Sequence, residues 1–316
     1  MKKILLLIML LIPFNVVAMS ASSMVAVDLD NDYVYFDANK DDKRLIASIT
    51  KIMTTIVTIE NIDIDKKITV GKEVLKAYGS AIYINVGEKI TIRDLLYGLI
   101  MRSGNDAAVV LAKNVAGSME GFAHLMNELA SNIGMKNSNF VNAHGLEEND
   151  GSANYSTAYD MALITKYAMN NKTFREIFGT KNYVAKSSDK TYRWTNKNKL
   201  LHSEDYITGG KTGFTKKARR TLVTTASRNN INVVVVTLND GNDFLDHKNM
   251  YEEIFRNYAG ICMQYGNVRC LDPETPYYGM HGSKLQKQIV QEYLEDPNAL
   301  EVEAALICQK YGEDEE

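Results

Sequence analysis

The sequence contains few of the residues that form metal sites or disulfide frameworks. Among its 316 residues there are only three cysteines, Cys262, Cys270 and Cys308, and the five histidines lie far apart. No His-Glu-x-x-His or Cys-x-x-Cys pattern is present, so the sequence gives little support for a metal site. A Cys262–Cys270 disulfide is possible after export, but the cysteine-free main body must be stabilised by core packing.

An excess of charge of one sign is also absent. The formal net charge is -3, which gives no reason to expect a nucleic acid or a strongly anionic partner. Hydrophobic residues make up 45% and charged residues 24% of the chain, as in ordinary globular proteins. The length suits one large domain or two modest ones.

The apolar run near the start, from Ile4 to about Ala18, is too short for a comfortable membrane span. Lys2 and Lys3 precede it, and small residues follow at Val16-Val17-Ala18 or Ala18-Met19-Ser20. This order is typical of a secretory signal, so we expect residues 1–20 to be a signal peptide. The alternative is a buried first helix. The mature chain is therefore expected outside the cytoplasm, in the periplasm or cell-wall space, with membrane association left open.

The hydrophobic pattern predicts strands near both ends of the main body and helices between them. The expected strands are 24–28, 33–36, 183–185, 192–194, 221–226 and 232–238. The expected helices are 47–60, 92–100, 106–115, one from about 118, 157–169 and 243–258, with a long loop at 137–154. This order predicts an α/β (α+β) fold in which helices cover an antiparallel sheet, with a mostly helical insertion between Tyr78 and Thr157.

The first candidate site is Ser48-Ile49-Thr50-Lys51, at the start of the helix expected over 47–60. Residues three apart share a helix face, so the Ser48 hydroxyl and the Lys51 amine fall within possible hydrogen-bond reach. A serine hydroxyl is a poor nucleophile until a base removes its proton. Burial or a nearby positive charge lowers a lysine pKa and allows it to be that base. Taken alone, the pattern is more typical of a capping serine and a solvated lysine.

Two further segments have the same ambiguity. Ser103-Gly104-Asn105 lies between two expected helices, where a hydroxyl and an amide could relay a proton and hold a substrate, or could simply cap a helix. Lys211-Thr212-Gly213 is expected just before a strand. Its amine and hydroxyl could bind a carboxylate, and Gly213 would allow a substrate backbone to come close. The alternative is a glycine-rich turn with a solvated lysine.

The order Ser-x-x-Lys, Ser-x-Asn, Lys-Thr-Gly is the signature of penicillin-binding proteins and serine β-lactamases. Over residues 22–259 the chain also resembles the low-molecular-mass D-alanyl-D-alanine carboxypeptidases of the peptidase S11 family. Six segments carry the resemblance: Ala47–Thr54, Ser103–Ala108, Phe140–Leu146, Ser156–Ala162, Asn196–Leu201 and Lys211–Thr215. It implies a β-lactamase/transpeptidase-like fold, with residues 21–260 as the catalytic domain and peptidoglycan pentapeptide as the substrate.

The resemblance also implies roles for these residues. Lys51 would take the proton of Ser48, which would attack the carbonyl between the last two D-alanines, and water would hydrolyse the acyl-enzyme. Ser103 would pass a proton to the leaving amine, and Asn105 would hold the peptide. The substrate carboxylate would be bound by Lys211, Thr212, Thr215 and Lys199, and Gly213 would allow the substrate backbone to come close. The backbone N–H groups of Ser48 and Phe214 would stabilise the oxyanion. His144 either lines the cleft or is a structural loop residue. No metal or organic cofactor is expected, and β-lactam antibiotics would be covalent inhibitors.

The sequence departs from the family pattern in two places. After Lys-Thr-Gly-x-Thr the family usually has Ala-Gly, whereas this chain has Ala218-Arg219. The acidic residues 261–316 are expected to form a short tail of unknown role. An acidic tail is poorly suited to an anionic membrane surface, so the family's β-rich C-terminal domain and amphipathic membrane anchor are not carried over to this chain. Three alternatives stay open: a D,D-endopeptidase, a serine β-lactamase, which the lack of a Glu-x-x-Leu-Asn stretch after Ser103 disfavours, and an inactive penicillin-binding scaffold protein.

Overall fold

The computed structural model describes residues 19–30, 32–228 and 231–265, with side chains described up to Phe255. Most of the expected signal peptide, most of the acidic tail and the cysteine side chains lie outside these residues, as do Asn31 and the expected turn at 229–230. Within the described ranges, no helix is both long enough and apolar enough to cross a membrane.

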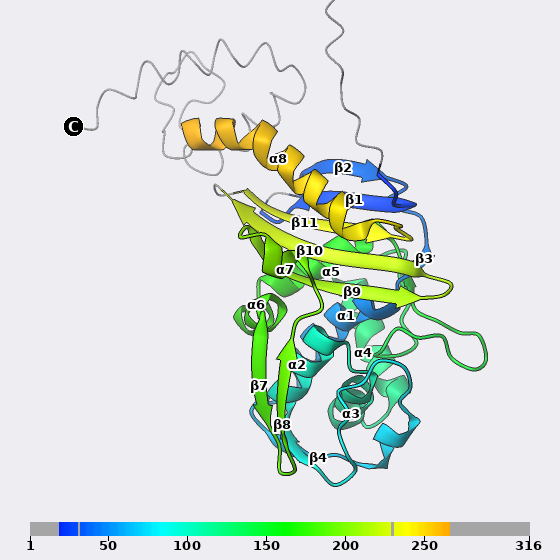
Figure 1. The fold of residues 1–316 in the computed structure, drawn as a ribbon. Helices are drawn as coiled ribbons and strands as arrows, with labels where there is room; N and C mark the ends of the chain where they lie inside the picture. The colour runs from blue at the N-terminus through cyan, green and yellow to red at the C-terminus, as the bar shows by residue number, and fades with distance from the viewer. Residues whose placement is uncertain (1–18, 31, 229–230, 266–316) are drawn as a thin grey trace, which may run out of the picture.

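A five-stranded antiparallel sheet forms the centre of the molecule (Figure 1). Its strand order is β2-β1-β11-β10-β9. The strands span Val34–Ala38 (β2), Ser23–Asp28 (β1), Ile231–Leu238 (β11), Arg219–Arg228 (β10) and Ile207–Thr215 (β9). The four valines of β11, Val233 to Val236, are fully buried because both faces of this central strand are covered.

Each face of the sheet supports its own apolar core. On one face, Val233 and Val235 pack with Tyr251 and Ile254 of α8 (Asp243–Tyr265). On the other face, Val234 and Val236 join a larger cluster with α1 (Lys51–Asn61) and α5 (Ala158–Met169). Figure 1 shows α8 on one side of the sheet and the helical region on the other. Successive side chains of a strand point to opposite faces of the sheet, so the side chains of β11 alternate between the two cores.

The helical region lies beyond the second face. Its remaining helices are η1 (Ala47–Thr50), η2 (Lys72–Lys76), α2 (Ile92–Arg102), α3 (Asn105–Ala116), α4 (Met119–Asn132), α6 (Lys172–Gly179) and α7 (Leu200–Ser203). Three two-stranded sheets accompany them: β3 (Arg44–Leu45) with β6 (Tyr155–Ser156), β4 (Lys67–Thr69) with β5 (Lys89–Thr91), and β7 (Asn182–Lys186) with β8 (Thr191–Thr195). Hydroxyl groups of Thr91, Ser118 and Thr157 cap α2, α4 and α5, which explains where these helices begin.

The structure differs from the sequence expectation along β9. Lys211–Gly213 lies inside this strand, not before a strand, and Gly209 and Gly210 belong to it as well. These glycines are close-approach positions: a Cβ at Gly209 would lie 2.3 Å from the Phe178 ring, and one at Gly210 would lie 2.4 Å from Asn198 Nδ2. A glycine-rich segment therefore forms a buried strand because its neighbours leave no room for side chains.

Candidate active site

Ser48 lies in the 3-10 turn η1 that leads into α1, against strand β9. Ala47, the residue before it, has φ +48°, in the left-handed region that is unfavourable for alanine. On the other side, a Cβ at Gly213 would lie only 2.9 Å from the backbone nitrogen of Ser48. The absence of a side chain at Gly213 therefore allows β9 to pass directly beside the start of this turn.

Lys51 is fully buried and sits at the centre of the site. Its Nζ is 3.0 Å from Ser48 Oγ, 2.8 Å from Asn105 Oδ1 and 2.6 Å from the His144 carbonyl oxygen. Burial, followed by the charges of Lys211 and Lys197, holds the Lys51 pKa well below its usual value. A neutral amine has two N–H donors and one lone pair, so it can donate to Asn105 and His144 while accepting the Ser48 proton.

Lys211 forms a second buried amine centre. It is 1% exposed, and its Nζ donates to Ser103 Oγ at 3.1 Å and to the Thr212 carbonyl at 2.6 Å. Burial, with a smaller effect from the charge of Lys197, lowers its pKa to about 7. Ser103 adopts φ +64° at the end of α2, a conformation that turns the chain between α2 and α3. The Ser103 hydroxyl therefore faces Lys211.

The loop that follows α4 positions the carbonyl that holds Lys51. Gly145 has φ +85°, and a Cβ there would lie 2.0 Å from the Ala47 carbonyl oxygen. Thr54 donates to the Ala143 carbonyl at 2.7 Å, and Asn142 Oδ1 accepts from the Gly145 N–H at 2.7 Å. The loop is therefore packed tightly against the start of α1, which fixes the His144 carbonyl over Lys51.

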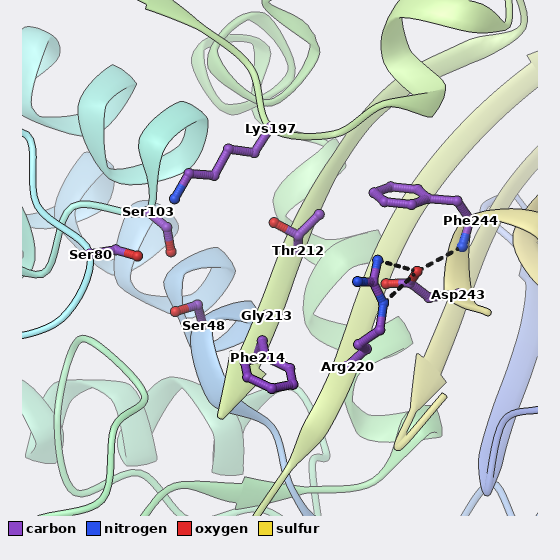
Figure 2. Close-up of a pocket in the computed structure, with 10 residues that line it drawn as sticks. All are labelled: Ser48, Ser80, Ser103, Lys197, Thr212, Gly213, Phe214, Arg220, Asp243 and Phe244. Carbon is purple, nitrogen blue, oxygen red and sulfur yellow. Dashed lines mark hydrogen bonds and ion pairs between the residues drawn. The ribbon is translucent and has the colours of Figure 1, made fainter. Parts of the chain in front are cut away.

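A pocket of about 410 Å³ opens beside Ser48 (Figure 2). Its ten lining residues are Ser48, Ser80, Ser103, Lys197, Thr212, Gly213, Phe214, Arg220, Asp243 and Phe244. Figure 2 shows the Lys197 amine directed toward Ser103 on one side and Arg220 bonded to Asp243 on the other. The Arg220 guanidinium donates twice to Asp243 Oδ1, at 2.9 and 2.7 Å, and its central carbon lies 5.6 Å from the centre of the Phe244 ring. The pocket therefore combines a nucleophile candidate with two cationic groups.

Four expected site residues contact protein groups and are not among the residues that line this pocket. The His144 ring is not among the lining groups: its Nδ1 accepts from the Leu146 N–H, and burial, followed by the charge of Lys51, lowers its pKa to about 3. Thr215 Oγ1 accepts from the Ala218 N–H, and Lys199 Nζ lies over the Phe244 ring at 5.9 Å. Asn105 donates to the Tyr78 carbonyl at 2.6 Å and accepts from Lys51. Its side-chain amide therefore links Tyr78 to Lys51.

Sequence reasoning missed half of the pocket. Ser80, Lys197, Arg220, Asp243 and Phe244 were not among the candidates, although all line it. Lys197 lies within the Asn196–Leu201 segment that carried the family resemblance, so that segment held a signal. Arg220 and Asp243 come from β10 and the start of α8, and only the tertiary fold brings them together.

The fold and the site together define the class of DD-peptidases and penicillin-binding proteins. The crystal structure of the Streptomyces K15 DD-transpeptidase is similar, with a TM-score of 0.71 and 32% identity, covering 76% of this chain and 98% of that chain. The structure of D-alanyl-D-alanine carboxypeptidase from Mycobacterium tuberculosis H37Rv gives a TM-score of 0.72 at 25% identity, over 76% of this chain and 92% of that one.

The D-alanyl-D-alanine carboxypeptidase family, peptidase S11, matches residues 13–242, and the chain therefore belongs to this family. The D-alanyl-D-alanine carboxypeptidase DacF of Bacillus subtilis is 33% identical over 225 residues, which cover 69% of this chain and 57% of that protein. The D-alanyl-D-alanine carboxypeptidase of Streptomyces sp. K15 is 37% identical over 216 residues, 63% of this chain and 73% of that protein. The expected family and the expected sheet covered by helices are both confirmed.

Proposed function

We propose that this protein is a serine-type D,D-carboxypeptidase that removes the terminal D-alanine of peptidoglycan stem peptides through an acyl-enzyme on Ser48. The observation that carries the proposal is the fully buried Lys51 amine, 3.0 Å from Ser48 Oγ and held by Asn105 and the His144 carbonyl. A buried lysine with a lowered pKa beside a serine hydroxyl is a paired base and nucleophile.

In the acylation step, neutral Lys51 accepts the Ser48 proton as Ser48 Oγ bonds to the carbonyl carbon between the two D-alanines. The backbone N–H groups of Ser48 and Phe214 receive the developing oxyanion. Support for this pair is the close approach of β9 at Gly213 to the backbone nitrogen of Ser48 in η1. One such donor typically contributes about 10²–10³ in rate. The C–N bond then breaks, and the proton that Lys51 accepted is relayed through the Ser103 hydroxyl to the leaving amine of D-alanine, so that Lys51 is neutral again and Ser103 keeps its proton.

The terminal carboxylate of the substrate would be recognised by cationic groups that line the pocket or lie beside it. Burial lowers the pKa of Lys211 to about 7, and a carboxylate bound beside it would raise that pKa and favour the ammonium form. Arg220, held in one orientation by Asp243, supplies a planar donor group that suits a carboxylate. Lys197 lines the pocket on the side of Ser103, and its charge would add to the attraction for an anionic substrate.

Hydrolysis of the acyl-enzyme by water completes the reaction and regenerates Ser48. The same serine would be acylated by β-lactam antibiotics, which are the expected covalent inhibitors. The pentapeptide substrate lies in the cell wall, so the enzyme must be exported to reach it. We therefore also propose that the leader within residues 1–20 is removed and that the enzyme acts in the periplasm or cell-wall space.

The decisive measurement is covalent labelling with a fluorescent penicillin. We expect the wild-type protein to form an adduct and Ser48→Ala to form none, because the attacking oxygen is gone. Ser188→Ala, an exposed serine in the β7–β8 turn, is the matched control and should label like the wild type. An adduct on the Ser48→Ala variant would contradict the assignment.

Release of D-alanine from a synthetic pentapeptide then separates the remaining alternatives. A carboxypeptidase releases one D-alanine per peptide, whereas an endopeptidase cleaves a cross-linked dimer preferentially. A serine β-lactamase would instead turn over the penicillin rapidly and leave no lasting adduct. A scaffold protein would release nothing from either peptide.

A further inference from the structure

The residues at the end of the expected signal belong to the folded domain. Ser20 donates its backbone N–H to Asp246 Oδ2 at 2.6 Å, and its hydroxyl lies 2.6 Å from Asp240 Oδ1 and 2.9 Å from Asp246 Oδ2. Met19 packs against the apolar core under α8, and the Ser22 N–H reaches the end of β11. The chain from Met19 onward is therefore part of the structure, although the sequence placed residues 19 and 20 in the signal.

The two carboxyl groups beneath Ser20 are deeply buried. Asp240 is 1% exposed and Asp246 is 3% exposed. Within the described residues, neither forms an ion pair with a lysine or arginine, and Asp240 Oδ2 has no hydrogen-bond partner. Burial raises the pKa of Asp246, and the charge of Asp240 adds to the rise. An Asp240–Asp246 side-chain hydrogen bond contributes to this rise, so the pair can share a proton. Ionisation of both carboxyl groups would need a nearby cation, because unpaired buried charge is costly.

The position of Ser20 distinguishes the two possible cleavage points. Cleavage after Ser20 would remove every bond that Ser20 makes to Asp240 and Asp246 and leave both buried acids with fewer donors. Cleavage after Ala18 keeps these bonds. It also creates an α-amino group on Met19, whose nitrogen is only three covalent bonds, roughly 3–4 Å, from the nitrogen of Ser20.

We propose that processing occurs between Ala18 and Met19, and that the α-ammonium group released on Met19 pairs with the Asp240–Asp246 carboxyl groups. Hydrolysis of this peptide bond by a signal peptidase consumes one water and leaves a carboxylate on Ala18 and an ammonium on Met19. The α-amino group has an ordinary pKa of about 7.7–8.0, so it is charged at neutral pH. The inference depends on export, but not on the proposed peptidase activity.

The first test determines the mature terminus. The full chain is expressed with its own leader in a secreting host, and the exported protein is examined by N-terminal sequencing and intact mass. We expect the chain to begin at Met19. A chain that begins at Ala21, or one that retains residues 1–18, would overturn the processing site.

The second test measures the ion pair directly. Two proteins are released from a cleavable fusion, one beginning at Met19 and one beginning at Val17, so that they differ in whether residue 19 carries a free amine. We expect the thermal midpoint of the Met19 protein to be about 2–4 °C higher, the shift typical of one favourable interaction of this kind in a domain of this size. Equal midpoints would overturn the pairing.

A variant background shows whether the acid pair is responsible. In Asp240→Asn/Asp246→Asn the difference between the two proteins should disappear, because no carboxylate remains to receive the ammonium. The matched control is Asp189→Asn/Asp205→Asn, which changes two exposed acids and should preserve the difference. A difference that persists in the Asp240/Asp246 background would also contradict the pairing. None of these readouts uses a peptide or a β-lactam, so they stand apart from the test of Ser48.

Discussion

The inner and outer parts of the active site differ in how firmly their charged groups are held. Lys51 and Lys211, in the inner part, are 0% and 1% exposed and bond to neighbouring protein groups. In the outer part, the side chain of Arg220 is 45% exposed, and Phe214 is 60% exposed at the mouth of the pocket. The buried lysines of the inner part are thus fixed before substrate binds, whereas Arg220 and Phe214 in the outer part remain partly solvated.

The difference has an energetic meaning. In the buried part, low dielectric strengthens each electrostatic interaction and shifts pKa values, as it does for both lysines. In the outer part, here called the rim, water screens the same interactions, so each contributes less. Substitutions in the inner part should therefore change the reaction rate strongly, and substitutions at the rim should change it modestly.

The largest effect beyond loss of Ser48 itself is expected for Lys51→Met. The variant keeps a chain of similar length but has no base, so we expect acylation by penicillin to fall by about 10²–10⁴-fold, the usual range for loss of a general base. In the wild type, the acylation rate should rise with pH as Lys51 loses its proton, with a midpoint well below the usual lysine pKa because burial destabilises the ammonium. Stopped-flow acylation across pH measures both quantities.

The control for this substitution is Lys136→Met, which removes an exposed lysine just after α4 and should leave the rate unchanged. Circular dichroism and thermal melting establish that Lys51→Met remains folded. If the variant kept both the wild-type rate and its pH dependence, Lys51 would not be the base, and the contrast between the inner part and the rim would lose its main support.

A smaller effect is expected at the rim, for Arg220→Gln. Loss of the guanidinium removes a charge-assisted hydrogen bond to the substrate carboxylate, which is typically worth about 1.5–3 kcal/mol when buried. The partial exposure of Arg220 reduces this to about 1 kcal/mol, so kcat/KM for the pentapeptide should fall roughly 5–10-fold. Steady-state release of D-alanine measures the change.

A substrate comparison gives this prediction its control. The pentapeptide with a C-terminal amide has no carboxylate to bind, so Arg220→Gln should change its poorer kcat/KM much less. Arg193→Gln, on the exposed face of β8, should affect neither peptide. An equal loss for acid and amide would mean that Arg220 supports the structure of the pocket and does not recognise the carboxylate.

The same contrast explains how much could be predicted from the sequence. The inner residues Ser48 and Lys51 are three positions apart on one helical segment, so a local pattern indicates their contact. Ser103 and Lys211 were found through motifs whose order is specific to the family, and the structure brings them within 3.1 Å. Most of the strands and helices were also predicted, because their apolar periods are local.

The remaining features depend on tertiary contacts. Arg220 becomes a pocket residue only because Asp243 orients it, and these residues are 23 positions apart. His144 contributes a backbone carbonyl to Lys51, a role that the identity of a side chain cannot reveal. The glycines of β9 resembled a turn because the packing that requires them, by Phe178 and Asn198, lies in other segments.

The smallest effect is expected at Arg219, which follows the end of β9 and departs from the glycine usual in the family. Arg219 has φ +60°, a left-handed conformation that costs a residue with a Cβ about 1–2 kcal/mol and costs glycine little. Arg219→Gly should therefore stabilise the fold, although glycine also increases the entropy of the unfolded chain by about 0.5–1 kcal/mol. The net gain of about 0.5–1 kcal/mol corresponds to a rise of about 2 °C in Tm.

Arg219→Ala separates backbone strain from charge, because it removes the guanidinium but retains the Cβ. We expect no gain in Tm from this variant, and kcat/KM within about twofold of the wild type for both variants, since Arg219 is exposed and is not among the ten pocket residues. Differential scanning calorimetry measures the change in Tm, and D-alanine release measures kcat/KM.

A gain in Tm shared by Arg219→Gly and Arg219→Ala would assign the effect to charge. A loss of activity in Arg219→Gly alone would mean that the strained turn positions Phe214 or Arg220, which are cross-strand partners, and the rim would then be less independent of the fold than its exposure suggests.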